Sequence, residues 1–230
     1  MTKIHFFVSY KHKKVDTDDI KPKMYIFLHG YNETGKNMRC LEEKFKEISS
    51  KQSIFLYPNA PFKVENSNQF CWFKIVFDEI DYSINEEFIF ESMQQSLPYL
   101  SNYIDQNLNK HKHFSYNDII LVGFSQGGVF SIHSSLMLKD KVSCAISFSG
   151  GFANPDNYIL KNKINKPPIL LTHGLNDKIM PYKYSLKGEK ELKEAGIDVQ
   201  CHLLQNTKHL ITNEAISIAQ DFIKNVNTLN

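Results

Sequence analysis

Short apolar runs alternate along this chain with longer segments in which apolar residues recur at helical spacing. The short runs predict strands at residues 3–10, 23–28, 53–57, 118–122, 142–148, 168–172 and 197–204. The first two flank a charged turn and are expected to form an antiparallel entry hairpin. Strands that alternate with helices are typical of a mostly parallel sheet covered by helices on both faces, so the pattern predicts an α/β fold.

Three stripes of apolar residues predict helices that pack against this sheet. The stripes consist of Met38, Leu41, Phe45 and Ile48; of Met93, Leu97, Leu100, Ile104 and Leu108; and of Ala215, Ala219, Phe222 and Val226. A further helical stretch covers residues 129–138, whereas residues 58–82 form a long irregular segment, a kind that is often functional. With no repeat or linker in the sequence, residues 1–230 are expected to form a single domain.

Composition narrows the functional classes. The chain has 230 residues, and its 27 basic and 25 acidic residues give a formal net charge of +2. So balanced a charge provides no strong field to hold a nucleic-acid backbone or an anionic membrane, so no nucleic-acid partner is expected. The four cysteines lie far apart without metal-ligand spacing, which favours a reducing compartment.

The start of the chain shows no targeting pattern. The apolar run at residues 4–10 is broken by His5 and Ser9 and ends at the basic cluster 11–14, so it is too short for a signal peptide. The basic cluster is interpreted as a solvated turn rather than a phosphate site. Since no stretch reaches the length needed to cross a bilayer, we expect no membrane insertion and a cytoplasmic location.

One short motif indicates nucleophilic catalysis. The apolar run 119–122 leads into Gly123-Phe124-Ser125-Gln126-Gly127-Gly128, and a helical stretch follows. This is G-x-S-x-G in a strand, turn and helix context, where the serine hydroxyl projects above the sheet from a strained turn. Ser125 is therefore the predicted nucleophile. The backbone N–H of Gln126, at the positive end of the helix, is the first candidate donor to an oxyanion.

Chain order selects the other members of a triad, because on this type of sheet the acid and then the histidine follow the serine. His209 lies past the last strand and is the predicted base, whereas His202 lies inside that strand. Asp177 follows the strand at 168–172 and is the predicted acid. The alternatives are weaker, since two of them precede strands and the third lies in a loop: Asp140, Asp198 and Asp156.

The loop after the strand at 23–28 supplies the second oxyanion donor, for which the N–H of Tyr31 is the candidate. His29 is expected to hold this loop in place. A metal site built from His29, His173 and His209 is an alternative, but no pair among them has the spacing of a known metal motif, so no metal is expected.

Taken together, these motifs make the sequence similar to the phospholipase/carboxylesterase family that includes the acyl-protein thioesterases. The matching residues are Leu28-His29-Gly30 with Thr34-Gly35, Pro58-Asn59-Ala60-Pro61, Trp72-Phe73, the Ser125 motif, Ser149-Gly150, His173-Gly174 with Asp177 and Pro181, and His209. The resemblance implies an α/β-hydrolase fold without a large cap domain and without a cofactor. It also implies that the substrates are carboxylic esters, lysophospholipids or S-acylated proteins.

The chain departs from the family pattern at Lys208, at Lys74 and at Tyr31-Asn32-Glu33, and these departures bear on substrate preference. Trp72 and Phe73 are predicted to border an acyl-binding groove, although both could instead pack a small core. The predicted activity is hydrolysis of esters or thioesters by a serine hydrolase. A non-catalytic binding protein on the same fold and a peptidase are the alternatives.

Overall fold

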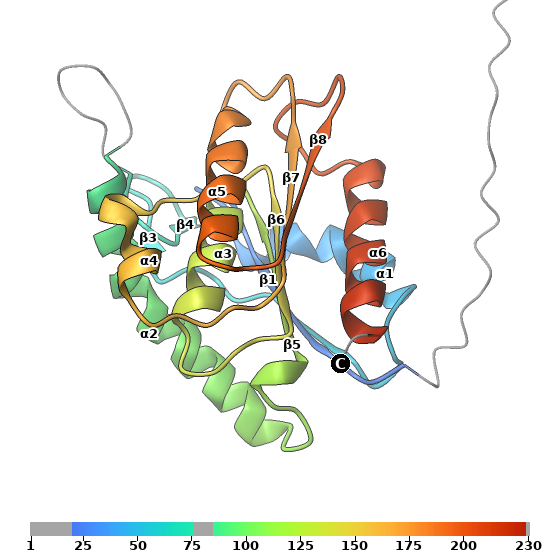
Figure 1. Ribbon diagram of the computed structural model, residues 1–230. Coiled ribbons are helices and arrows are strands. Elements are labelled where there is room, and N and C mark those ends of the chain that lie inside the picture. Colours follow the sequence, from blue (N-terminus) through green and yellow to red (C-terminus); the bar gives the residue numbers. More distant parts are fainter. Residues whose placement is uncertain (1–19, 76–84, 229–230) are drawn as a thin grey trace, which may run out of the picture.

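Six parallel strands form the central sheet of the computed structural model, which describes residues 20–75 and 85–228 (Figure 1). Their order across the sheet is β2-β1-β5-β6-β7-β8. The strands are β1 (Met24–Leu28), β2 (Ile54–Leu56), β5 (Ile119–Phe124), β6 (Cys144–Phe148), β7 (Ile169–Gly174) and β8 (Val199–Leu204). Because all five pairings are parallel, the carboxyl ends of the strands share one edge.

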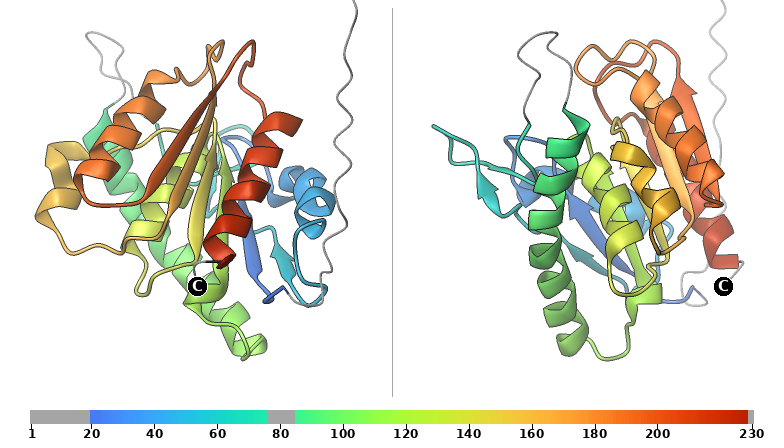
Figure 2. Two further views of the ribbon diagram at one scale, coloured as in Figure 1. Left: turned by 45° about the vertical axis from the view of Figure 1, so that its right-hand side comes forward. Right: turned by 60° about the vertical axis from the view of Figure 1, so that its left-hand side comes forward.

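Helices cover both faces of the sheet (Figure 2). One face packs against α2 (Glu86–Lys110), α3 (Gln126–Met137), α4 (Tyr158–Lys161) and α5 (Lys183–Glu194). The other packs against the 3-10 helix η2 (Gly35–Leu41), α1 (Glu42–Lys46) and α6 (Asn213–Thr228). The remaining elements are the antiparallel pair β3 (Phe62–Lys63) and β4 (Phe70–Cys71), and the 3-10 turns η3 (Tyr116–Asp118) and η4 (Pro155–Asn157).

The alternation of side chains along β1 explains why there are two cores. Met24, Ile26 and Leu28 belong to the core beneath α2 and α3. Tyr25 and Phe27 point the other way, into the core beneath α1 and α6. All five residues of the strand are buried, as expected for a parallel sheet covered on both sides.

The predicted strands between residues 23 and 204 are all present, with small differences at their ends. The predicted strand at 3–10, its hairpin, the basic cluster at 11–14 and part of the irregular segment lie outside the described residues. The single apolar stripe from Met38 to Ile48 is divided between η2, α1 and the turn after α1, in which Ile48 lies. Within residues 20–75 and 85–228, no helix combines the length and the hydropathy required to cross a membrane. The extent of a single domain over residues 1–230 stays a prediction.

Close backbone packing brings the turn after β5 against both its own helix and the neighbouring strand. A Cβ atom added at Gly127 would lie 2.0 Å from the carbonyl oxygen of Leu28. One added at Gly123 would lie 2.0 Å from the carbonyl oxygen of Gly127. Since backbone atoms on both sides would have to move, only glycine permits this approach of β1, β5 and α3.

We expect Gly127→Ala to lower the free energy of unfolding by roughly 3 kcal/mol, at the upper end of the cost of overpacking. Alanine is the better helix former, so a loss of stability would have to be steric. Urea denaturation followed by circular dichroism measures the effect. The matched control is Gly30→Ala, where the nearest atom to a new Cβ is a mobile carboxylate oxygen of Glu33 at 3.2 Å. Equal stability of both variants with the parent protein would contradict the packing argument.

Candidate active site

Ser125 occupies the sharp turn between β5 and α3. Its backbone has a φ of 53° and a ψ of −118°, a conformation that a residue with a side chain adopts only when its surroundings enforce it. The Ser125 N–H donates to the carbonyl oxygen of Phe148 at the end of β6, at 2.8 Å. The strained turn is thus fixed to the neighbouring strand, and the serine side chain lies at the carboxyl edge of the sheet.

Three side chains from three loops at this edge form a continuous chain of hydrogen bonds. The Ser125 hydroxyl and Nε2 of His209 are 2.9 Å apart. Nδ1 of His209 lies 2.6 Å from Oδ2 of Asp177. Ser125 follows β5, Asp177 follows β7 and His209 follows β8, so the parallel register brings together residues 84 and 32 positions apart.

The surroundings of Asp177 favour its charged form. The backbone N–H groups of Ile179 and Met180 both donate to Oδ1, each at 2.9 Å. Burial of the carboxyl opposes ionisation, but the bonds from His209 and from these amides outweigh it and hold the pKa of Asp177 below its ordinary value. Asp177 therefore accepts hydrogen bonds through both oxygens, while 16% of the His209 side chain stays exposed.

Backbone hydrogen bonds tie the loop of the acid to the loop of the base. The N–H of Asn176 donates to the carbonyl oxygen of Thr207 at 2.8 Å, and Leu175 donates to Leu204 at 3.0 Å. A Cβ atom at Gly174 would meet the Thr207 carbonyl oxygen at 2.3 Å, so glycine permits the two loops to touch. Asp177 and His209 are thereby held at a fixed separation.

The two candidate oxyanion donors border the same pocket as Ser125. Gln126 is the first residue of α3, so its N–H has no acceptor within the helix. Tyr31 lies in the loop after β1, where Asn32 adopts a φ of 55° and Oε2 of Glu33 accepts the Gly30 N–H at 2.9 Å. Of the residues that depart from the family pattern in this loop, Asn32 therefore provides the turn conformation and Glu33 provides the hydrogen-bond acceptor.

Trp72 does not border the pocket, which corrects the expectation that it lines an acyl groove. It is 1% exposed and stacks on Phe130, with ring centroids 5.1 Å apart. Its indole N–H donates to the carbonyl oxygen of His29 at 2.9 Å, and its backbone N–H donates to the side chain of Gln126 at 2.8 Å. The indole ring fills the core beneath the loop after β1. Its N–H holds this loop in place through the bond to His29.

Phe73, by contrast, is one of the residues that line the pocket beside Ser125, and its contact with an acyl chain stays a prediction. The pocket is a cavity of about 260 Å³ whose walls are mostly apolar. Its other members include Ile89, Val129, Phe152, Met180 and Tyr184, with Tyr31, Ile75 and Ile179 among the exposed residues. Apart from Tyr31, these wall residues come from loops and helix faces that the sequence analysis did not assign to the site. The sequence offered a hint for Phe152, because this residue comes two positions after the Ser149-Gly150 motif.

The remaining candidates fall outside the hydrogen-bonded trio. His202 lies within β8, and Nε2 of His29 accepts the Ala60 N–H at 3.0 Å, consistent with holding its loop. Asp156 lies in η4. In the described part of the chain, no group of three or more His, Cys, Asp or Glu side chains could hold a metal ion. All four cysteines are free.

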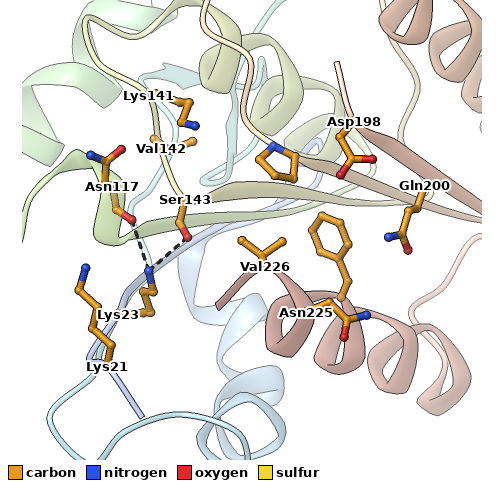
Figure 3. Close-up of a pocket in the computed structure, with 12 residues that line it drawn as sticks. Lys21, Lys23, Asn117, Lys141, Val142, Ser143, Asp198, Gln200, Asn225 and Val226 are labelled. Carbon is orange, nitrogen blue, oxygen red and sulfur yellow. Dashed lines mark hydrogen bonds between the residues drawn. The ribbon is translucent and has the colours of Figure 1, made fainter. Parts of the chain in front are cut away.

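The opposite edge of the sheet carries a second cavity, of about 420 Å³, bordered by Lys21, Lys23 and Asp198 among others (Figure 3). The buried ammonium of Lys23 donates to the Asn117 carbonyl and to the Ser143 hydroxyl, both at 3.3 Å. The Asp118 carboxylate lies 2.9 Å from Lys21 and 4.0 Å from Lys23. The Asp118 carboxylate thus offsets part of the positive charge of these two lysines, and the cavity contains none of Ser125, Asp177 and His209.

Comparison with known proteins agrees with this geometry. Residues 12–227 match the model of the phospholipase/carboxylesterase family. The chain belongs to this family. Its similar curated relatives include carboxylesterase SOBER1 of Arabidopsis thaliana, which is 23% identical over 86% of this chain and 88% of that protein. Acyl-protein thioesterase 1 of Saccharomyces cerevisiae is 28% identical over 72% of this chain and 74% of that protein.

Solved structures of similar shape support the same assignment. Esterase PE8 superimposes with a TM-score of 0.78 at 26% identity, covering 91% of this chain and 95% of that one. Arabidopsis thaliana SOBER1 superimposes with a TM-score of 0.74 at 23% identity, covering 90% and 99%. The predicted α/β-hydrolase fold is therefore confirmed, and this member of the phospholipase/carboxylesterase family is a carboxylic ester hydrolase.

We expect Trp72→Phe to lower the free energy of unfolding by about 1–2 kcal/mol, because the buried carbonyl of His29 loses its donor. Activity should fall by the same factor for short and long acyl esters, since the side chain braces a loop and touches no substrate. Urea denaturation and ester kinetics measure the two effects. The control Tyr25→Phe removes a buried bond to Ser49 on the other face of the sheet, and it should cost stability alone. If Trp72→Phe instead lost more activity on long acyl esters than on short ones, Trp72 would have to contact the acyl chain.

Proposed function

We propose that this protein hydrolyses uncharged acyl esters or thioesters through a catalytic triad of Ser125, His209 and Asp177. One observation carries the proposal: an unbroken chain of hydrogen bonds from Ser125 through His209 to Asp177, with bond lengths of 2.9 and 2.6 Å, beside an apolar pocket. A nucleophile within reach of a base, and a base oriented by an acid, is the arrangement that acyl transfer requires.

The reaction begins when Ser125 Oγ attacks the substrate carbonyl carbon while Nε2 of His209 takes the hydroxyl proton. Asp177, which accepts from Nδ1, keeps Nε2 free to receive that proton and stabilises the imidazolium that forms. The imidazolium then protonates the departing alcohol or thiol, which leaves an acyl group on Ser125. Water, deprotonated by His209, attacks the acyl-enzyme, and the proton returns to Ser125 as the carboxylic acid is released.

The backbone N–H groups of Gln126 and Tyr31 are assigned as the donors that stabilise the negatively charged oxygen of each tetrahedral intermediate. Donors fixed before the reaction stabilise charge without reorganisation, and removing one such donor typically costs about 10²- to 10³-fold in kcat. Two features support this role. Gln126 begins a helix of 12 residues, and its buried side chain is held between the backbones of Trp72 and Phe73.

The acyl chain is assigned to the pocket beside Ser125. Its apolar walls favour an uncharged chain, and exposed apolar side chains of Tyr31 and Ile179 border it on the solvent side. Lysophospholipids and S-acylated proteins both present such a chain next to an ester or a thioester, and acyl-protein thioesterases are among the curated relatives. No cofactor is required by this chemistry. The cytoplasmic location stays a prediction.

A peptidase on the same fold is the second candidate function. The apolar pocket favours the esterase, because its walls offer few polar groups to pair with the amides of an extended peptide. A non-catalytic binding role would leave the hydrogen-bonded chain from Ser125 to Asp177 without a use. Assays with esters, thioesters and peptides that carry the same acyl group would rank the three leaving groups directly.

We expect a fluorophosphonate probe to label the protein stoichiometrically at Ser125, and Ser125→Ala to abolish both labelling and hydrolysis. The loss in kcat should be on the order of 10⁶-fold, as for other serine triads. Intact-mass and peptide mass spectrometry locate the adduct. Labelling of a different residue in the folded protein would overturn the assignment of the nucleophile.

His209→Ala should reduce kcat by several orders of magnitude at unchanged stability, and His202→Ala provides the control. The control histidine is half-buried on β8 and makes no bond within the trio. The opposite ranking of these two variants would mean that the base is wrongly assigned.

Phe73→Ala should reduce kcat/KM more for octanoyl than for acetyl esters, because Phe73 is part of the pocket wall. Each buried methylene contributes about 0.8 kcal/mol, so the discrimination between chain lengths should weaken with every added methylene that loses its contact. Steady-state kinetics on acetyl, butyryl and octanoyl thioesters measure the trend. A uniform loss across the series, like that expected for Trp72→Phe, would remove Phe73 from the acyl site and leave the triad unaffected.

A further inference from the structure

A second histidine lies against the carboxylate assigned as the triad acid. Nε2 of His173 is 3.2 Å from Oδ2 of Asp177, the same oxygen that accepts from His209, and both side chains in this contact are fully buried. His173 is the fifth residue of β7, and Asp177 follows it four positions further along the chain. The catalytic steps above make no use of it.

The partners of His173 determine which of its nitrogens carries a hydrogen. Nε2 lies 2.6 Å from the carbonyl oxygen of Met180 as well as 3.2 Å from Asp177. A carbonyl and an ionised carboxylate can only accept, so Nε2 must be the donor. Burial holds the pKa of His173 below its ordinary value, against the opposing effects of the Met180 carbonyl and the Asp177 charge. A donating Nε2–H is therefore required in the neutral ring as well.

The other nitrogen of the ring ties this donor to the rest of the site. Nδ1 lies 2.7 Å from the Ser185 hydroxyl oxygen on α5, and that oxygen lies 2.7 Å from the carbonyl oxygen of Gly150. Gly150 lies directly before the pocket residues Gly151 and Phe152. One buried imidazole thus links the acid, the helix that follows it and the loop that forms the pocket wall.

We propose that His173 is a positioning residue for the acid: its Nε2–H, which donates to the Met180 carbonyl, lies beside Oδ2 of Asp177 and stabilises the charge of that carboxylate, so that less of the charge acts on His209. This inference rests on the proposed triad. Removal of the donor would leave Oδ2 with His209 as its single strong partner. The imidazolium form of His209 would then be favoured, and a base that must be neutral to act would become active only at higher pH.

The titratable groups that face His173 are few, which makes the pH dependence specific. They are Asp177, from the same loop system, and His209, from the loop after β8. The contacts from α5 and from the loop after β6 are made by the neutral groups of Ser185 and Gly150. A change in the acid limb of the activity profile can therefore be traced to the carboxylate and the two histidines.

Two amide substitutions separate the two nitrogens. In His173→Gln the amide nitrogen can replace Nε2 and still donate to Met180 beside Asp177, whereas in His173→Asn the shorter side chain reaches only the position of Nδ1 and Ser185. We expect His173→Asn to move the midpoint of the acid limb of kcat/KM upward by about half a pH unit and to lower kcat about tenfold. His173→Gln should retain the parent midpoint, and Ser185→Ala, which removes only the Nδ1 contact, should retain it too.

Fluorophosphonate labelling of each variant distinguishes a failure of the positioning role from a failure of the proposed triad. Suppose that Ser125 is labelled in the parent protein and in every variant. If His173→Asn and His173→Gln then both keep the midpoint of the parent, the positioning role is overturned and the triad stands. If Ser125 is not labelled in the parent protein, the proposed function itself fails.

A measurement on the unmodified protein covers the case in which a variant does not fold. Nitrogen-15 spectra of the imidazoles should show Nε2 of His173 bonded to hydrogen throughout the pH range of activity. A hydrogen-free Nε2 would overturn the proposal.

Discussion

The packing of β5 against α3 without intervening side chains is the constraint on which the rest of the site depends. Gly123 and Gly127 bring the strand and the helix so close that the residue between them must take a positive φ. The strain at Ser125 is offset by the large buried core on both sides of β5 and by the bond from its N–H to Phe148. Ser125 and the first residue of the helix consequently border the same pocket.

The parallel sheet then brings Asp177 and His209 to the same edge as Ser125. Because every strand runs in the same direction, the loops after β5, β7 and β8 must meet at one edge, and two of them are joined by backbone bonds between Asn176 and Thr207. The geometry of the trio is thus set by backbone packing rather than by exposed side chains. This explains how Lys208, whose side chain is exposed, replaces the family's usual glycine without displacing His209.

The sequence allowed prediction of those features that depend on local pattern and chain order. The strands at 118–122 and 168–172, the elbow at Ser125 and the positions of Asp177 and His209 follow from apolar runs and from the loops after them. Helix α5 was not predicted, because its buried face consists of Ser185, Gly188 and Leu192 and lacks a continuous apolar stripe. The β3–β4 hairpin was missed because each of its strands has only two residues.

Trp72 shows the limit of reading function from side-chain type. An aromatic pair in a long loop predicts substrate contact equally well for both members, yet only Phe73 lines the pocket, although both side chains are buried in the same core. Both residues lie in the bend that follows β4, and only one of the two rings carries a polar atom. The indole N–H finds the His29 carbonyl inside the core, whereas the phenyl ring has no polar atom that requires a partner. The hydrogen bond therefore holds Trp72 to the loop after β1, whereas Phe73 borders the pocket beside Ser125.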